Sequence, residues 1–353
     1  MDRVLHIVDE KTSPDLLRQL ALLVADGDTV LSAGPPPRAT LRLPVRPIHQ
    51  PMGSARLAGL RMRPSAAAAD ILHAWSPRAT AAGRELSLST GKALVVSLSC
   101  AGPADRAGAL REAVGPGLFA VTVPTRSDRS VLIRGGVPER FVHVLPPAAD
   151  GPPPGDSVRR RVRESLGLDE ATRLVAVPDT MVRHAGHDLA SWAHAIVCKV
   201  TRRVCLLLPG GGPHERHVRF FAGTTGHDED VFFTGTRFAL ADCLAASDLA
   251  AFFRTRDVGV SAAAAAMAAG LGIAGSRTPD LAELAPDGEA ALLVEPGDPR
   301  VAAAAMLKLV EQPDLAGRLG EEARRRAGRL FRPAACRRRL EEIHAAAVEA
   351  KVF

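Results

Sequence analysis

Residues 231–298 contain the stretch that decides the fold, because short apolar runs alternate there with segments of helix length. The strand-like runs are VFFTG at 231–235, DLAAFF at 248–253, GIAGS at 272–276 and LLVE at 292–295. Between them lie segments such as SAAAAAMAAG at 261–270, whose composition strongly favours a helix. Strands that alternate regularly with helices predict a parallel sheet that is covered on both faces.

The same alternation extends over the rest of the chain. Further strands are expected at residues 3–8, 29–33, 92–99, 118–124, 173–178 and 203–209. The segment AADGPPPGD at 148–156 is rich in Pro and Gly and is the best linker candidate. We therefore predict an α/β protein with two Rossmann-like, doubly wound domains at 1–150 and 151–332. One helix is expected from Pro299 to about Ala327, and a terminal helix, at 333–353, is expected to return to the first domain.

Composition narrows the class of protein. A chain of 353 residues is long enough for two cores, and 46% apolar with 24% charged residues is ordinary for a globular protein. Only 4% of the residues are aromatic and no nucleic-acid-binding motif is present, which argues against a nucleic-acid partner. The five Cys residues form no CxxC pair, which argues against a zinc site or a disulfide framework. With no signal peptide and no apolar run of roughly 18 residues, a cytoplasmic location is expected.

Several motifs occur in an ordered series along the chain. They are ADILHAWSPRAT at 69–80, LLLPGGGPHER at 206–216, VFFTGTR at 231–237, AMAAGLGIAGS at 266–276 and LLVEPGD at 292–298. The series resembles that of the family 4 glycosyltransferases, of the "glycosyl transferases group 1" type. The resemblance implies the GT-B fold, with an acceptor-side domain, a nucleotide-sugar-side domain and a cleft between them. It also implies metal-independent transfer of a sugar from a nucleoside-diphosphate sugar with retention, and no cofactor.

The resemblance further implies that cations hold the donor diphosphate. Relatives use an Arg and a Lys after the first strand of the second domain, where positive charge offsets the charge that develops on the leaving group. Here the two positions are Thr180 and Ala185. Arg183 is close enough in sequence to replace them, although it could also be a surface residue. Gly212, in the turn that resembles G-x-G-P, is expected to help form the donor cleft.

A second part of the donor motif is also altered. Where relatives have two Glu residues eight positions apart, this chain has Asp257 and Ala265. Asp257 keeps the charge that contacts the donor sugar and is a candidate catalytic residue, whereas Ala265 cannot accept a hydrogen bond from a ribose hydroxyl. Arg254 and Arg256 are candidate phosphate cations, and either could instead be solvated. The candidate donor-binding residues are Arg183, Gly212, Arg254, Arg256, Gly259 and Glu283.

The first domain carries one further candidate. His73 is retained from a segment that in relatives reads D-I-x-H-x-H-S, and Trp75 occupies the place of the second His. His73 is therefore a second candidate catalytic residue, while a single His beside an apolar strand is also commonly structural.

A basic segment suggests a further partner. No acidic residue lies between Asp28 and Asp70, and that interval contains Arg38, Arg42, Arg46, Arg56, Arg61 and Arg63. Such a segment could meet an anionic acceptor or the inner face of a membrane. A solvated basic loop is the simpler interpretation and is favoured.

Two functions therefore stay open. The chain is either an active glycosyltransferase with an unidentified acceptor, or a catalytically inactive relative that binds a nucleotide sugar or a protein partner. The altered positions Thr180, Ala185, Asp257 and Ala265 favour the second. A nicotinamide dehydrogenase has little support, because no GxGxxG follows the first strand.

Overall fold

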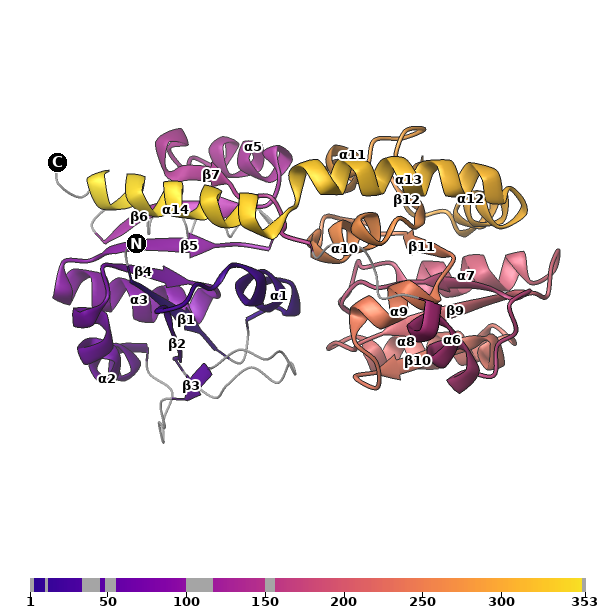
Figure 1. The fold of residues 1–353 in the computed structure, drawn as a ribbon, viewed down its shortest axis with the longest axis horizontal. Helices are drawn as coiled ribbons and strands as arrows, with labels where there is room; N and C mark the ends of the chain where they lie inside the picture. Colours follow the sequence, from indigo (N-terminus) through magenta and orange to yellow (C-terminus); the bar gives the residue numbers. More distant parts are fainter. Residues whose placement is uncertain are drawn as a thin grey trace. The chain divides into compact units, whose positions relative to one another are not determined.

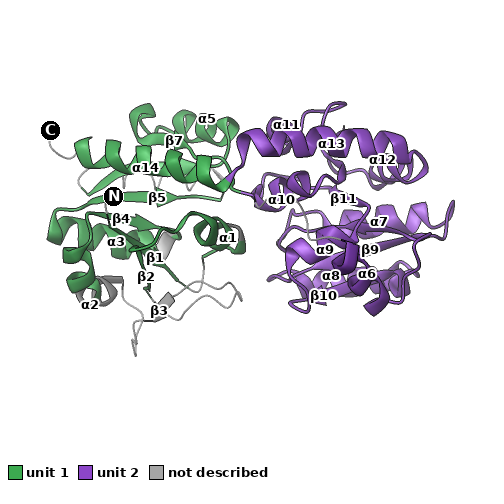
Figure 2. Ribbon diagram, viewed as in Figure 1, with its two compact units in different colours: residues 1–148, 333–353 green, residues 149–332 purple. Residues whose placement is uncertain are grey.

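The computed structural model describes residues 3–9, 12–33, 45–47, 55–99, 117–149 and 156–350. The chain divides into two compact units (Figure 2). Unit 1 comprises Met1–Ala148 and Pro333–Phe353, and unit 2 comprises Ala149–Arg332. The candidate residues Arg38 and Arg42 of the basic segment lie outside the described residues, and so does most of the predicted linker. No helix in the described part of the chain is long and apolar enough to cross a membrane.

Unit 1 is built on a parallel sheet whose strands follow the order β3-β2-β1-β4-β5-β6-β7. These strands are β1 Val4–Val8, β2 Thr29–Ser32, β3 Val45–Pro47, β4 Ile71–Ala74, β5 Ala93–Ser97, β6 Leu118–Val123 and β7 Val142–Val144. The helices are α1 Pro14–Leu23, α2 Ala55–Ala68, α3 Pro77–Thr90, α5 Arg126–Arg134 and α14 Pro333–Ala350, with a short 3-10 turn at Glu139–Phe141. Every residue of β1, β4 and β5 is buried, as expected for strands covered on both faces (Figure 1).

Local sequence signals fix where the helices of unit 1 begin. The Ser13 side chain accepts a hydrogen bond from the Leu16 amide and Ser76 accepts one from the Ala79 amide, so each serine satisfies an amide of the first turn. The next residue in each case is proline, Pro14 or Pro77, which suits the first helical position because no hydrogen-bond donor is needed there.

Unit 2 contains a second parallel sheet, in the order β10-β9-β8-β11-β12-β13. Its strands are β8 Arg173–Ala176, β9 Val204–Pro209, β10 Val231–Gly235, β11 Leu249–Phe252, β12 Gly272–Ser276 and β13 Leu292–Val294. Its helices are α6 Asp156–Ser165, α7 His187–Val197, α8 Glu215–Thr224, α9 Leu240–Ala246, α10 Ser261–Ala269, α11 Pro279–Leu284, α12 Pro299–Glu311 and α13 Pro313–Leu330, and Asp228–Asp230 forms a 3-10 turn. The predicted α/β class and the two Rossmann-like parallel sheets are confirmed.

Helices cover both faces of the sheet in unit 2 (Figure 1), and apolar clusters fill the space between helices and sheet on each face. Successive residues of a strand point to opposite faces, so Val175 packs in one apolar cluster and Ala176 in the other. The first cluster includes residues of α7, α8 and α12, and the second includes residues of α10 and α13.

The prediction of one helix from Pro299 to about Ala327 is wrong. The structure has two helices there, α12 and α13, which meet at Gln312. Pro313 lacks an amide hydrogen and its ring clashes with a preceding helical turn, so α12 ends before it and α13 begins with it.

A buried network of aromatic and imidazole rings lies in the core of unit 1. Trp75 Nε1 donates to His6 Nδ1 over 3.1 Å. Since the indole nitrogen can only donate, His6 Nδ1 carries no proton, and His6 Nε2 must donate to Asp28 Oδ2 at 3.3 Å. His344 of α14 lies 3.1 Å from His73 Nδ1 through its Nε2. The network therefore joins α14 to the central strands of unit 1.

Burial keeps two of these imidazoles neutral. It lowers the pKa of His73 well below its usual value. Burial also lowers the pKa of His344, to about 3. The imidazole rings of His73 and His344 are therefore neutral in the folded protein near pH 7.

We expect the stability of the protein to fall as the pH is lowered from 6.5 towards 3. In that range the unfolded chain protonates its histidines while His344 stays neutral in the folded state, so the unfolded state binds more protons. With a folded pKa of about 3, His344 alone costs about 2 kcal/mol of stability at about pH 5. Urea unfolding at about pH 7.5 and about pH 5 measures this loss.

The matched variants are His344→Gln, which removes the buried imidazole, and His217→Gln, which removes an exposed one. The first should lose less stability on acidification than the parent chain, and the second should behave like the parent in a buffer with EDTA. An unchanged acid loss in His344→Gln would contradict the assignment.

Candidate functional site

The candidate site lies at the carboxyl edge of the sheet in unit 2. The chain runs outward from β8 to β9 and β10 on one side and from β11 to β12 and β13 on the other, so the strand order reverses between β8 and β11. Open α/β sheets bind ligands at the carboxyl ends of the strands at such a reversal. The loops at this point are 177–186, after β8, and 253–260, after β11.

The two loops are in close contact. Gly186 precedes α7 with a φ of 83°. A Cβ atom at Gly186 would overlap the carbonyl group of Phe253, so glycine is required for both its backbone angle and its lack of a side chain. The Thr255 amide donates to the His184 carbonyl oxygen over 3.0 Å. The start of α7 is therefore fixed against the end of β11.

His184 has a strained backbone within this contact. Its φ of 78° is in the left-handed region, which non-glycine residues rarely adopt. The His184 Nδ1 atom lies 3.0 Å from Thr255 Oγ1, so the side chain and the carbonyl group of this residue both bind Thr255. Strained residues that their surroundings hold in place are frequent at binding sites.

Arg254 occupies the centre of the edge and is fully buried. Its Nε and Nη2 atoms donate to the two carboxylate oxygens of Asp179 over 2.7 and 2.8 Å. Its Nη1 atom donates to Asp280 Oδ2 over 3.1 Å. The guanidinium group, expected from the sequence to be a candidate for donor phosphate, is thus bound by two carboxylates and positions three loops.

Asp257 lies next to the same network. Its Oδ1 atom accepts a hydrogen bond of 3.3 Å from the Asp280 amide, at the start of α11. Asp280 Oδ1 in turn accepts from Thr278 Oγ1 over 2.5 Å. Asp257 is half-buried, so the structure places its carboxylate at the rim of the loop cluster rather than in the core.

The other two candidate arginines, Arg183 and Arg256, are exposed. Among the described residues, neither of them forms an ion pair or a hydrogen bond through its side chain. Partial desolvation lowers the pKa of the nearby His184, and the positive charges of Arg256 and Arg183 lower it further. The carboxyl edge therefore carries two cations close to a neutral imidazole, with no carboxylate partner among the described residues.

The start of α10 follows these cations along the chain. Gly259 has a φ of 117°, and the Val260 side chain cannot cap the helix. The first-turn amides of a helix without a side-chain cap favour an anion. One turn further, Ala265 is half-buried and contributes only a methyl group.

The altered positions after β8 lie on the first loop. Ala185 is fully buried and Thr180 is half-buried. A Cβ atom at Gly212 would overlap the Met181 carbonyl group, so the turn after β9 packs directly on this loop. Gly212 is thus placed beside the segment that carries Arg183.

The two remaining candidate residues are Glu283 and His73. Their hydrogen bonds to Arg326 and Ser97 do not involve the loops after β8 and β11. Glu283 is half-buried near the end of α11, and its carbonyl oxygen accepts a hydrogen bond of 2.9 Å from Arg326 Nη2. His73 belongs to unit 1, where it is fully buried and hydrogen-bonds to Ser97 Oγ over 2.8 Å. Its neutral, enclosed ring favours a structural role.

Sequence reasoning missed Asp179 and Asp280 as partners of Arg254. The sequence does contain a signal for this pairing. Asp179 follows the end of β8, Asp280 follows β12 and Arg254 follows β11, each within a few residues. Carboxyl ends of parallel strands meet at one edge, so charged residues just beyond them can pair. No sequence pattern predicts whether Arg254 or Arg256 turns inward.

Replacing Arg254 should be far more damaging than replacing Arg256. Arg254→Met leaves the buried Asp179 and Asp280 carboxylates without their cation, and we expect a loss of about 3–5 kcal/mol. Arg256→Met alters an exposed side chain and should stay within about 0.5 kcal/mol of the parent. Urea unfolding followed by circular dichroism compares the two variants, and equal losses would show that the buried ion pairs contribute nothing specific.

Solved structures of other proteins share the fold of this chain. HepE of Anabaena, solved in complex with UDP and glucose, aligns with a TM-score of 0.84 at 17% identity over 97% of this chain and 99% of its own. Sucrose-phosphate synthase of Thermosynechococcus elongatus gives 0.78 at 18% identity over 99% and 100% of the chains. WaaG, a glycosyltransferase involved in lipopolysaccharide biosynthesis, gives 0.74 at 16% identity over 95% and 98%.

A search of curated protein sequences gave no significant match. Residues 158–326, which cover most of unit 2, match the family model described as "Glycosyl transferases group 1". The chain has the GT-B fold, and the greater part of unit 2 is similar to this glycosyltransferase family.

Proposed function

We propose that unit 2 binds a nucleoside-diphosphate sugar and that the protein transfers the sugar to an acceptor, with retention and without a metal in the reaction. The observation that carries this proposal is the pair of exposed cations, Arg183 and Arg256, at the strand-order reversal. Both lie beside His184 and have no carboxylate partner among the described residues. A diphosphate is an anion of matching charge, and guanidinium groups bind phosphate oxygens in pairs.

These cations would replace the Arg and Lys that relatives use. The pyrophosphate would lie between Arg183 and Arg256 and face the start of α10, whose amide groups add positive potential. As the bond from the sugar to the phosphate lengthens, negative charge grows on the leaving diphosphate, and fixed cations stabilise that charge. Asp257, at the rim, is the residue we assign to the hydroxyl groups of the donor sugar.

The structure of HepE with UDP and glucose supports the choice of ligand class, because that protein shares the fold over the full chain. Unit 1 would supply the acceptor side. Ala265 offers no acceptor for the ribose hydroxyls, so this chain should bind its nucleotide more weakly than a chain with Glu at that position. A hydroxyl without a partner costs about 1–3 kcal/mol.

A second candidate function has its own supporting observation. Arg254 is neutralised by Asp179 and Asp280, so the cation nearest the centre of the edge is not free for phosphate. A protein with only peripheral cations could bind a nucleotide sugar without transferring it, and would then act as a binding or partner protein.

Calorimetric titration with UDP, GDP and ADP sugars tests the shared step. Arg183→Ala and Arg256→Ala should each weaken binding of the preferred nucleotide about tenfold or more, since a charge-assisted hydrogen bond contributes about 1.5–3 kcal/mol. Arg318→Ala, which removes an exposed cation on α13, is the matched control and should bind normally. No saturable binding by any nucleotide would refute both functions, whereas binding without product in acceptor screens would select the second.

We also propose that the basic segment between Arg38 and Arg63 attaches the protein to anionic membranes, where a lipid-linked acceptor would be accessible. Each basic residue near such a surface contributes about 1 kcal/mol. Parent protein should float with vesicles of anionic lipid and not with neutral vesicles, and a variant with Ser at Arg38, Arg42 and Arg46 should float less. Equal flotation of the two proteins would refute the attachment.

A further inference from the structure

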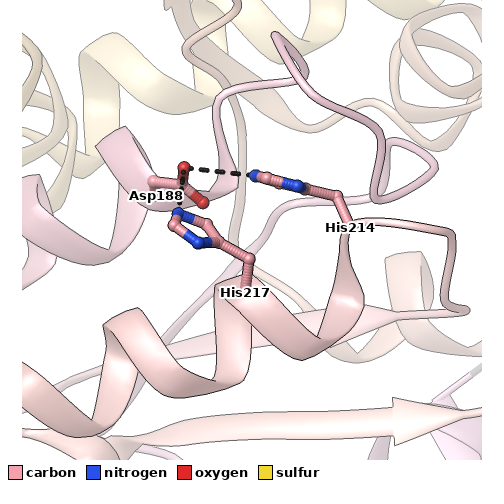
Figure 3. Close-up of side chains that lie close together, drawn as sticks. All are labelled: Asp188, His214 and His217. Atoms are coloured by element: carbon pink, nitrogen blue, oxygen red, sulfur yellow. Dashed lines mark ion pairs between the residues drawn. The ribbon is translucent and has the colours of Figure 1, made fainter.

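Three side chains that could bind a metal converge on the surface of unit 2 (Figure 3). Asp188 is the second residue of α7. His214 immediately precedes α8, and His217 lies in its first turn. Figure 3 shows both imidazole rings turned towards the Asp188 carboxylate.

The spacing of the histidines explains their convergence. Residues three apart lie on the same side of a helix, so His214 and His217 present their rings together. The two rings are stacked with their centroids 4.4 Å apart. The Nε2 atom of His214 lies 3.6 Å from Asp188 Oδ2, and that of His217 lies 3.3 Å from the same oxygen.

These separations match a metal site. Zinc bonds of about 2.0–2.1 Å at tetrahedral angles place neighbouring ligand atoms about 3.3–3.4 Å apart. The candidate ligand atoms of Asp188, His214 and His217 all lie within 4.8 Å of one another. A cation could therefore be bound after modest adjustments of these side chains.

Nothing else in the described part of the chain occupies these groups. Neither contact between a histidine and Asp188 has hydrogen-bond geometry, and neither imidazole hydrogen-bonds elsewhere among the described residues. The other carboxylate oxygen, Asp188 Oδ1, is buried without a hydrogen-bond partner. A buried carboxylate oxygen that lacks a donor is costly, and a cation on this group would offset that cost.

We propose that Asp188, His214 and His217 bind a divalent transition-metal ion of the zinc type. Two imidazoles and one carboxylate suit zinc, cobalt or nickel better than magnesium or calcium, which prefer oxygen ligands. All three side chains are partly exposed, with His217 the most accessible at 53%, so water can complete the coordination.

The ion would act as a structural clip. It would join the start of α7 to the start of α8, and hence the loop after β8 to the turn after β9. Backbone hydrogen bonds already connect these segments. The Met181 amide donates to the Gly211 carbonyl oxygen, and the His214 amide donates to the Met181 carbonyl oxygen. This structural ion takes no part in the proposed sugar transfer, which needs no metal. The two proposals can therefore be tested independently.

A second cluster, Cys198, His227 and Asp230, offers a built-in comparison. Cys198 is buried and its sulfur atom already contacts His194. The His227 Nδ1 and Asp230 Oδ2 atoms are 4.0 Å apart, which is further than either histidine nitrogen lies from Asp188 Oδ2 in the first cluster. The thiol also gives this cluster a distinct optical signature, because cobalt bound to sulfur absorbs strongly in the near ultraviolet.

The test is a cobalt titration of the full chain after treatment with EDTA, followed by competition with zinc. We expect one saturable site with weak visible bands and no thiolate band. Asp188→Asn, His214→Ala and His217→Ala should each weaken cobalt binding at least tenfold, while Cys198→Ser should bind like the parent. Zinc should raise the melting temperature of the parent and of Cys198→Ser, but not that of His214→Ala.

Three results would overturn the proposal. They are the absence of saturable cobalt binding, a thiolate band that disappears in Cys198→Ser, and undiminished binding in the double variant His214→Ala/His217→Ala. Circular dichroism of each variant establishes that it is folded, and the exposed His217 makes its variant the most secure of the series.

Discussion

A buried guanidinium group joins the loops that follow β8, β11 and β12. Arg254 forms a two-bond pair with Asp179 and a further bond with Asp280, and all three side chains are almost entirely removed from solvent. Separating any one of them from the others would leave a charge in a medium that solvates it poorly. The strained backbone at His184, the contact at Gly186 and the start of α11 are arranged around this cluster.

This arrangement determines which cations remain for a ligand. Because Arg254 is neutralised inside the sheet edge, positive charge at the surface comes from Arg183 and Arg256. Partial desolvation lowers the pKa of His184, and the charges of Arg256 and Arg183 lower it further. Neither arginine has a carboxylate partner in the described part of the chain, and this uncompensated positive charge would favour an anionic ligand such as the proposed diphosphate.

The buried polar network of unit 1 is built on hydrogen-bonded imidazole rings, in contrast to the buried ion pairs of unit 2. There the buried rings of His6, His73 and His344 are held by directional hydrogen bonds, with Trp75 as a donor. Such a network contributes specificity at the cost of acid sensitivity, because unfolding releases imidazoles that protonate readily. The terminal helix α14 contributes His344 to this network, so the last segment of the chain completes the core of the first unit.

Sequence by itself determined the α/β class, the two parallel sheets and the resemblance to a glycosyltransferase family, because the periodicity of apolar runs and the order of glycine-containing turns are local properties. From that resemblance it also predicted that Thr180, Ala185 and Ala265 occupy altered donor positions. It expected a continuous helix across Pro313, where the proline ring breaks the helix. Only the tertiary structure decided that Arg254 turns inward while Arg256 faces solvent. The physical reason is that the partners Asp179 and Asp280 are distant in sequence and meet only where parallel strands end. The same reason applies to Asp188, His214 and His217, whose shared geometry requires two helix starts to lie side by side.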